Sequence, residues 1–159
     1  MTPQQVSEKL KAQFSDKILE VKIEGVLEPY IKISASSVKE IATALRQDPE
    51  FQFDYLMCLS GVDNGKNILS VVYHFSSMHH RHKITVKVEV PADKPEVPSV
   101  SSIWPTANWH EREAYDLIGI KFIGHPDLRR MLLPEDWEGH PLRKDYKVPE
   151  FYQGMKVPY

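Results

Sequence analysis

The sequence has one cysteine in 159 residues, and it has no apolar run of the roughly 18 residues that a membrane-spanning helix needs. A single cysteine excludes an internal disulfide framework, and it excludes a zinc site or iron–sulfur cluster held by cysteines of this chain alone. The first residues lack the features of a secretory signal or a mitochondrial presequence, so we expect neither. The net charge of −2 gives no electrostatic reason for nucleic-acid binding.

Proline is scarce in the first part of the chain and frequent in the last part. Residues 1–90 hold three of the 12 prolines, and residues 91–159 hold the others. Because proline interrupts helices and central strands, regular structure is expected mainly before residue 91. The length favours one compact unit with a sizeable core. We predict an α+β domain over residues 1–98, a helical region packed on it over residues 99–124, and an extended segment over residues 125–159.

Two helices are expected in the first part. Thr2-Pro3-Gln4-Gln5 has the pattern of a capping box with proline at the first helical position, which predicts a helix start. Ser37-Val38-Lys39-Glu40 has the pattern of a second capping box, and Asp48-Pro49 is expected to end that helix. Its apolar stripe is formed by Val38, Ile41, Ala42 and Leu45.

Five strands are expected around these helices. The segments are residues 19–24, 30–33, 53–59, 68–75 and 83–90. Most alternate apolar and polar residues, whereas residues 53–59 are nearly all apolar, which predicts a strand covered on both faces. Asn64-Gly65 is expected to form a turn. The order α-β-β-α-β-β-β predicts an α+β fold of two layers: a mainly antiparallel or mixed sheet with helices on one face, followed by a short helix and an extended C-terminal segment.

The last part of the chain holds one further helix and a long segment without periodicity. Asn108 is expected to cap a helix that runs to Ile118, and Gly119 is placed to end it. The segment from residue 125 is too aromatic for a disordered tail and too long for a loop of a compact domain. Its aromatic residues are Trp137, Tyr146, Phe151, Tyr152 and Tyr159. We therefore expect it to pack on another protein.

The histidines and the cysteine predict no reactive site. His79, His80 and His82 lie between two strands, and a solvated hairpin loop is favoured over a metal site because no fourth ligand is evident. Cys58 lies in an apolar run with no basic neighbour, so it is expected to be a small core residue.

Charged residues concentrate on the helix before Gly119 and after it. Glu111-Arg112-Glu113 and Asp116 favour an ion-pair network, because nothing supplies the second wall of a two-carboxylate active site. Arg129-Arg130 and Arg143-Lys144 each follow a His-Pro, and without a glycine-rich loop they favour carboxylate contacts over phosphate binding. We expect the helix to hold the extended segment, with Arg129, Arg130 or Arg143 as partners.

Residues 109–120, Trp-His-Glu-Arg-Glu-Ala-Tyr-Asp-Leu-Ile-Gly-Ile, resemble the Glu-Arg-Glu-x-x-Asp-x-x-Gly pattern of the complex I thirty-kilodalton subunit family. That family is the C subunit of proton-pumping NADH:quinone oxidoreductase (NDH-1). Residues 125–134 and 137–146 resemble the rest of its signature, so the match spans about residues 98–147. One departure is Lys147, where relatives often have proline, and it affects only the path of the last dozen residues.

The resemblance implies a non-catalytic structural subunit in the peripheral arm of the respiratory complex, which supports electron transfer from NADH to quinone coupled to proton translocation. It implies no catalytic, cofactor-binding or metal-binding residue on this chain, with FMN and iron–sulfur clusters on partner subunits. The implied partners are the quinone-site subunit (the D or forty-nine-kilodalton type) and cluster-bearing subunits, at the cytoplasmic face of the bacterial inner membrane. Structural or interface roles are expected for Glu111, Arg112, Glu113, Asp116, Gly119, Arg129, Arg130, Trp137, Arg143, Lys144, Asp145 and Tyr146.

Two other functions stay open from the sequence. The first is the equivalent subunit of a related ferredoxin-fed complex or membrane-bound hydrogenase, because the electron-input subunits are other chains. The second belongs to a different class, a free-standing hydrolase that uses Glu111, Glu113 or Asp116. A monomer with a concave acidic pocket and turnover on small substrates would support this alternative.

Overall fold

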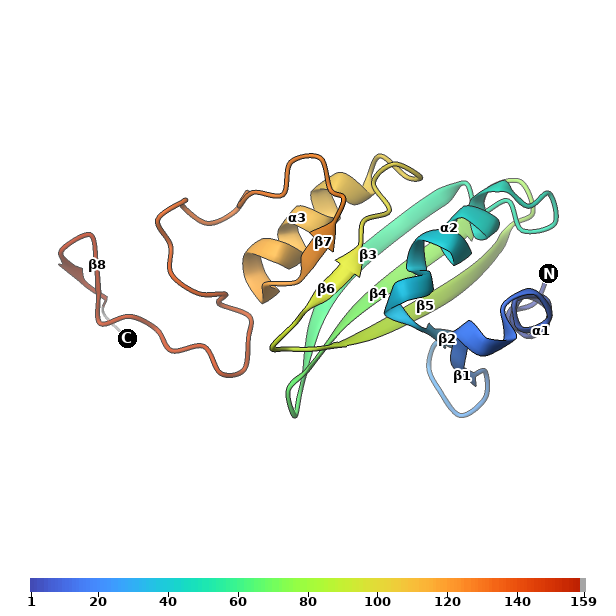
Figure 1. Cartoon of the computed structure of the whole chain (residues 1–159), viewed down its shortest axis with the longest axis horizontal. Helices are drawn as coiled ribbons and strands as arrows, with labels where there is room; N and C mark the ends of the chain where they lie inside the picture. The colour runs from blue at the N-terminus through green and yellow to red at the C-terminus, as the bar shows by residue number, and fades with distance from the viewer. Residues whose placement is uncertain (158–159) are drawn as a thin grey trace.

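The computed structural model describes residues 1–157, and it shows one mixed sheet with helices packed against it (Figure 1). The predicted α+β fold is confirmed. The sheet strands are β1 (Ile18–Lys22), β2 (Tyr30–Ile33), β3 (Tyr55–Gly65), β4 (Ile68–Ser77) and β5 (His82–Pro91). They lie in the order β1-β2-β5-β4-β3. β2 and β5 pair in parallel, and the other neighbours pair antiparallel.

Helix α1 (Pro3–Gln13) begins as its sequence predicts. The Thr2 side chain accepts a hydrogen bond from the Gln5 N–H, and the Gln5 side chain accepts one from the Thr2 N–H. This capping box pairs two amides that the first helical turn leaves free.

Helix α2 (Val38–Gln47) buries the predicted stripe, but its predicted capping box is wrong. A 3₁₀ turn (Ala35–Ser37) runs directly into the helix, so Ser37 has φ −97° and ψ 1° instead of the extended backbone typical of a capping residue. The Ser37 hydroxyl instead donates to the Ser34 carbonyl at 2.8 Å.

Both edge strands differ from their predictions. A register shift between Ile18 and Glu20 in β1 breaks the expected alternation and leaves Leu19 61% exposed. β3 begins at Tyr55, and it is not covered on both faces. Cys58 on it is half-buried and lies 3.3 Å from the Ser60 hydroxyl, so it is not a core residue.

The hairpin turns also differ from their predictions. The β3–β4 turn is formed by Lys66 and Asn67, both with positive φ, two residues after the predicted Asn64-Gly65. At the β4–β5 turn, His82 is buried and its Nε2 donates to the Phe51 carbonyl at 2.7 Å. The predicted solvated loop is confirmed for His79 and His80, which are exposed, and it is wrong for His82, which packs on the chain that follows α2. Among residues 1–157, no cluster of three His, Cys, Asp or Glu side chains is placed to hold a metal.

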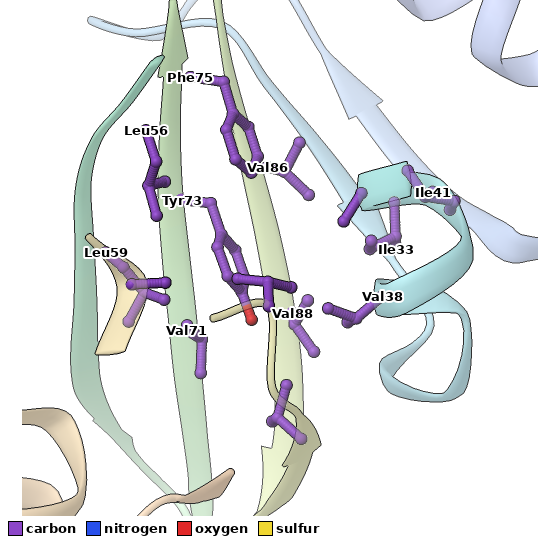
Figure 2. Packing of buried hydrophobic residues seen from close by; sticks show 14 of the residues in the cluster. Ile33, Val38, Ile41, Leu56, Leu59, Val71, Tyr73, Phe75, Val86 and Val88 are labelled. Carbon is purple, nitrogen blue, oxygen red and sulfur yellow. The ribbon is translucent and has the colours of Figure 1, made fainter. Parts of the chain in front are cut away.

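The core lies between the sheet and α2. In Figure 2, Tyr73 and Phe75 of β4 lie between Leu59 of β3 and Val88 of β5. Trp104 extends this core, because its ring packs at a tilt on Phe75 with centroids 4.7 Å apart, and its Nε1 donates to the Phe53 carbonyl at 2.9 Å. The segment that leads into α3 is thereby fixed to the domain.

Helix α3 (Ala107–Ile118) lies between two short strands that the sequence did not predict. These are β6 (Glu96–Pro98) and β7 (Lys121–Ile123), which pair in parallel. Their pairing joins the predicted domain over residues 1–98 to the predicted helical region over residues 99–124. Three residues are too few to show an alternating pattern. Thr106 precedes α3 without a side-chain cap, so Asn108 lies inside the helix and the predicted cap is wrong. No helix of the described residues is both long enough and apolar enough to cross a membrane.

The C-terminal extension, residues 125–157, runs past α3 and ends away from the sheet (Figure 1). Its only regular structure is a small hairpin of β8 (Phe151–Tyr152) and β9 (Met155–Lys156), which the sequence did not predict. The remaining predicted aromatic anchor, Tyr159, lies outside the described residues.

Candidate functional site

Helix α3 ends where the extension first touches it. Gly119 has φ 85°, a left-handed conformation that favours glycine, and its N–H bonds to the carbonyls of Ala114 and Tyr115. A Cβ at Gly119 would lie 2.5 Å from the ring of His140. His140 Nδ1 in turn donates to the Asp116 carbonyl at 2.9 Å. Glycine is therefore required here both for the backbone and for the approach of the extension.

The carboxylate of Asp116 is the centre of the contact between α3 and the extension. It is fully buried, and its Oδ1 accepts from Arg130 at 2.7 Å. Its Oδ2 accepts three backbone N–H groups, from Met131, Leu132 and Leu133, at 3.0, 2.8 and 3.0 Å. Burial raises the pKa of this carboxyl, but the hydrogen bonds from Leu133 and Arg130 outweigh burial and lower it below its usual value. Asp116 is thus a charged anchor for the turn after Arg130.

Arg130 joins α3 to a second turn of the extension. Besides the Asp116 carboxylate, its guanidinium donates to the Asp116 carbonyl at 3.1 Å and to the carbonyls of Trp137 and Gly139, both at 2.9 Å. The planar, forked donor set of arginine suits this simultaneous contact with several acceptors. This one side chain therefore links α3 to the turn at residues 137–139.

Two further arginines bind backbone carbonyls, and neither pairs with a carboxylate in residues 1–157. Arg112 lies over the Trp109 ring and donates to the carbonyls of Arg129 and Arg130, so the expected pair between Arg112 and Asp116 on the helix is not formed. Arg143 donates to the Ile118 carbonyl at 2.7 Å, at the end of α3 where helix carbonyls lack intrahelical partners.

Glu111 faces the domain instead of the extension. Its side chain is 0% exposed and accepts hydrogen bonds from the Ser99 hydroxyl at 2.6 Å and the Val100 N–H at 2.7 Å. Burial raises the pKa of Glu111 to about 7, and these two donors only partly offset it. The His125 Nε2 lies 3.9 Å from the carboxylate and bonds to the Asn108 carbonyl.

The remaining charged candidates lie at the surface. Glu113 and Asp145 are exposed, and Arg129 forms an exposed pair with Asp127 at 2.9 Å. The backbone N–H of Lys144 donates to the Asp63 carboxylate at 2.8 Å, which fixes the extension to the end of β3.

The aromatic candidates Trp137 and Tyr146 are half-buried within the extension. Trp137 packs on Tyr152 with ring centroids 5.0 Å apart, and Tyr146 packs on Gly139. The Trp137 Nε1 and the Tyr146 hydroxyl are buried and have no hydrogen-bond partner among residues 1–157. Buried polar groups without a hydrogen-bond partner are uncommon in native proteins.

The three carboxylates of α3 point into different surroundings, so no two of them face each other as a two-carboxylate hydrolase requires. The arrangement instead holds a segment of chain in place. Sequence reasoning gave no role to Ser99, His125 or His140, although both histidines lie in the quoted His-Pro motifs. Their partners are backbone carbonyls or residues distant in sequence, which no local pattern reveals.

The fold and site define an α+β domain whose extension is fixed to one helix by buried charges. A family model described as the respiratory-chain NADH dehydrogenase 30 kDa subunit matches residues 31–152. The C subunit of NADH-quinone oxidoreductase from Chloroherpeton thalassium is 49% identical over 151 residues, covering 94% of this chain and 63% of the relative. The corresponding protein of Chlorobium phaeobacteroides is 54% identical over 122 residues, covering 76% and 74%. The chain therefore belongs to this respiratory-chain family, whose members in these bacteria are called the C subunit.

Solved structures share this fold. A trypsin-resistant fragment (1-134) named Nqo5 is 28% identical, with a TM-score of 0.67, and the match covers 80% of this chain and 100% of the fragment. A chain of an archaeal membrane-bound sulfane sulfur reductase is 21% identical, with a TM-score of 0.75 over 91% of this chain and 85% of that one. The second likeness concerns the fold alone. The chain spans less than two thirds of the Chloroherpeton relative.

Proposed function

We propose that this chain is a non-catalytic structural subunit of the peripheral arm of NADH:quinone oxidoreductase, at the cytoplasmic face of a bacterial inner membrane. Membership of the family supports the assignment to this complex, and the geometry of α3 supports a structural, non-catalytic role. The buried acids of α3 are engaged with internal donors, so they are not free to act on a substrate. In this proposal FMN and the iron–sulfur clusters reside on partner subunits.

The main support for the proposal is the exposed apolar surface of the extension. Five of its large apolar side chains are more than half exposed: Leu132 56%, Leu142 59%, Val148 56%, Phe151 59% and Met155 65%. Exposed apolar side chains gathered on one segment are typical of a surface that binds another protein. The segment is nevertheless positioned, because Asp116 and Arg130 fix its turns. A prepositioned apolar surface loses less conformational entropy on binding than a disordered one.

We assign two roles to the residues of this region. Asp116, Arg130, Arg112 and Gly119 position the extension, and the partner-binding segment of the sequence to which it belongs is residues 125–159. Trp137, Tyr146, Arg143, Lys144 and Asp145, with the exposed apolar side chains, contact the quinone-site subunit of the D type and neighbouring cluster-bearing subunits. Glu111, Glu113 and Arg129 act structurally, beside a helical region over residues 99–124 and a domain over residues 1–98.

Deleting residues 148–159 tests this proposal. The domain should stay folded, because its core residues all precede this segment, while recovery of partner subunits with a tagged chain should fall. A double variant, Phe151→Asp with Met155→Asp, should lower recovery in the same way. Leu27→Asp is the matched control, since Leu27 is fully exposed on the β1–β2 loop outside the extension. Unchanged recovery of the quinone-site subunit with the deleted chain would contradict the proposal.

Limited proteolysis gives an independent check. In the isolated chain, cleavage should concentrate after residue 125, and it should be suppressed in the assembled complex. The solved Nqo5 relative is a trypsin-resistant fragment, which supports a resistant folded part in that protein. Uniform resistance of the isolated chain would show that the extension needs no partner.

A further inference from the structure

The outer side of β3 is an unprotected edge of the sheet. Among residues 1–157, the β3 backbone pairs with β4 alone. Alternate residues of an edge strand direct their N–H and C=O groups outward. β3 has 11 residues, so about half of its backbone groups face outward without a partner strand.

The two edges of the sheet differ in their protection. β1 has five residues, carries Glu20 and Lys22, and contains a register shift. β3 has neither lysine nor proline, and its one charged residue, Asp63, lies near its end. Its register shifts between Leu56 and Cys58 and between Asp63 and Gly65, and it is regular over the stretch between these two shifts. Natural proteins cover or charge their long edge strands, because such strands otherwise pair with other chains.

A groove of about 210 Å³ runs beside this regular stretch. Leu59 and Gly61 of β3, Glu113 and Leu117 of α3, and Leu142 of the extension contribute to its walls. Gly61 allows α3 to approach closely, since a Cβ there would lie 3.1 Å from the Cβ of Ala114. The groove therefore combines apolar side chains with polar surface, has the Glu113 carboxylate in its lining, and reaches Leu142 of the extension.

We propose that the outer edge of β3 pairs with an extended segment of a partner subunit, which adds a strand to the sheet. Its alternate apolar side chains enter the groove, and a lysine or arginine among them faces Glu113. This inference rests on the proposed function, because the partner belongs to the same assembly. Main-chain hydrogen bonds supply affinity in such strand addition, and pockets for alternate side chains supply specificity.

Two other occupants fit the observations less well. Two copies of this chain that pair antiparallel about Ser60 would bring their Glu113 carboxylates together, because Glu113 lines the groove beside the middle of the strand. The extension of the same chain crosses the end of β3, where the Lys144 N–H binds Asp63, and does not pair along the strand.

Amide hydrogen exchange tests the inference on the isolated chain and on the complex purified through a tag on it. In the isolated chain, the outward amides between Cys58 and Asp63 should exchange fast, and in the complex they should exchange at least roughly tenfold slower. Unchanged exchange in complexes that retain their partners overturns this inference and leaves the proposed function standing. Failure to recover any partner subunit overturns both. Protection that rises with the concentration of the isolated chain would assign the edge to a second copy instead.

A charge reversal tests the identity of the facing residue. Glu113→Lys should abolish the protection of β3 and lower partner recovery, whereas Glu113→Gln should have a smaller effect. Glu8→Lys is the matched control, because Glu8 is also an exposed helical glutamate and lies on α1. Thermal unfolding confirms that each variant is folded. Full protection of β3 in the Glu113→Lys complex would overturn the assignment of a basic partner residue.

Discussion

The domain before α3 and the extension after it are held in place by different forces. The domain buries apolar side chains such as Tyr73, Phe75 and Val86 against α2, and this burial is non-directional and spread over many residues. The extension is fixed mainly by directional hydrogen bonds that converge on Asp116 and Arg130. Loss of one apolar contact should weaken the whole domain, whereas loss of one polar anchor should release the extension and leave the domain folded.

Helix α3 contacts both regions, and its two buried acids show the same contrast. Glu111 faces the domain with two neutral donors, and burial raises its pKa to about 7. Asp116 faces the extension with three amides and a guanidinium, which together outweigh burial and lower its pKa. The charge state of a buried carboxylate is therefore set by the number and charge of its donors.

The largest effect is expected in the domain core. Phe53 is fully buried and packs on Phe75 and His82, so Phe53→Ala should lower the free energy of unfolding by about 3–5 kcal/mol. Urea denaturation followed by circular dichroism measures this. A loss below about 1 kcal/mol would show that the core is less tightly packed than described.

The next effect should be local to the extension. Arg130→Ala leaves the buried Asp116 carboxylate without its cation, and this should cost about 3 kcal/mol in the free energy that orders residues 130–139. Chymotrypsin cleavage near Trp137 should accelerate while the domain unfolds at nearly its original temperature. Arg130→Lys is the control, since it keeps the charge but loses the fork. If the domain melted together with the extension, the contrast between the two regions would be wrong.

Glu111 should make the domain less stable as the pH rises. Its pKa is raised from 4.5 to about 7, so its contribution is fully present below pH 4.5 and is lost as the pH rises through 7. The loss should amount to at most about 3 kcal/mol. Glu111→Gln should remove this slope. His82 and His140, whose pKa values burial lowers, act in the opposite direction below pH 6.5, so the difference between wild type and variant is the quantity to measure. Parallel pH profiles of the two proteins would contradict the assignment.

The smallest effect should come from the neighbouring arginine. Arg129 is exposed and pairs only with exposed Asp127, so Arg129→Ala should change stability by less than about 0.5 kcal/mol. The same chymotrypsin assay should show unchanged cleavage. A large effect would mean that the order of the extension does not depend on Arg130 alone.

Much of the fold was predictable because its signals are local. The apolar stripe of α2, the capping box of α1 and the alternating residues of β4 and β5 follow from helix and strand geometry. The predictions failed where tertiary structure overrides a local pattern. A 3₁₀ turn replaced the capping box at Ser37, a bulge turned Leu19 outward, and packing on the chain after α2 buried His82.

The sequence by itself determined the fold class, the helix that ends at Gly119 and the concentration of charge on that helix. Each of these depends on residues close together in the chain, where periodicity and capping act. Only the tertiary structure decided that Asp116 pairs with Arg130 while Glu111 binds Ser99, because those partners lie 12 or more residues apart. Glu111 and Asp116 carry the same functional group on one helix. Their roles differ because the folded chain brings different hydrogen-bond donors to the two buried carboxyls.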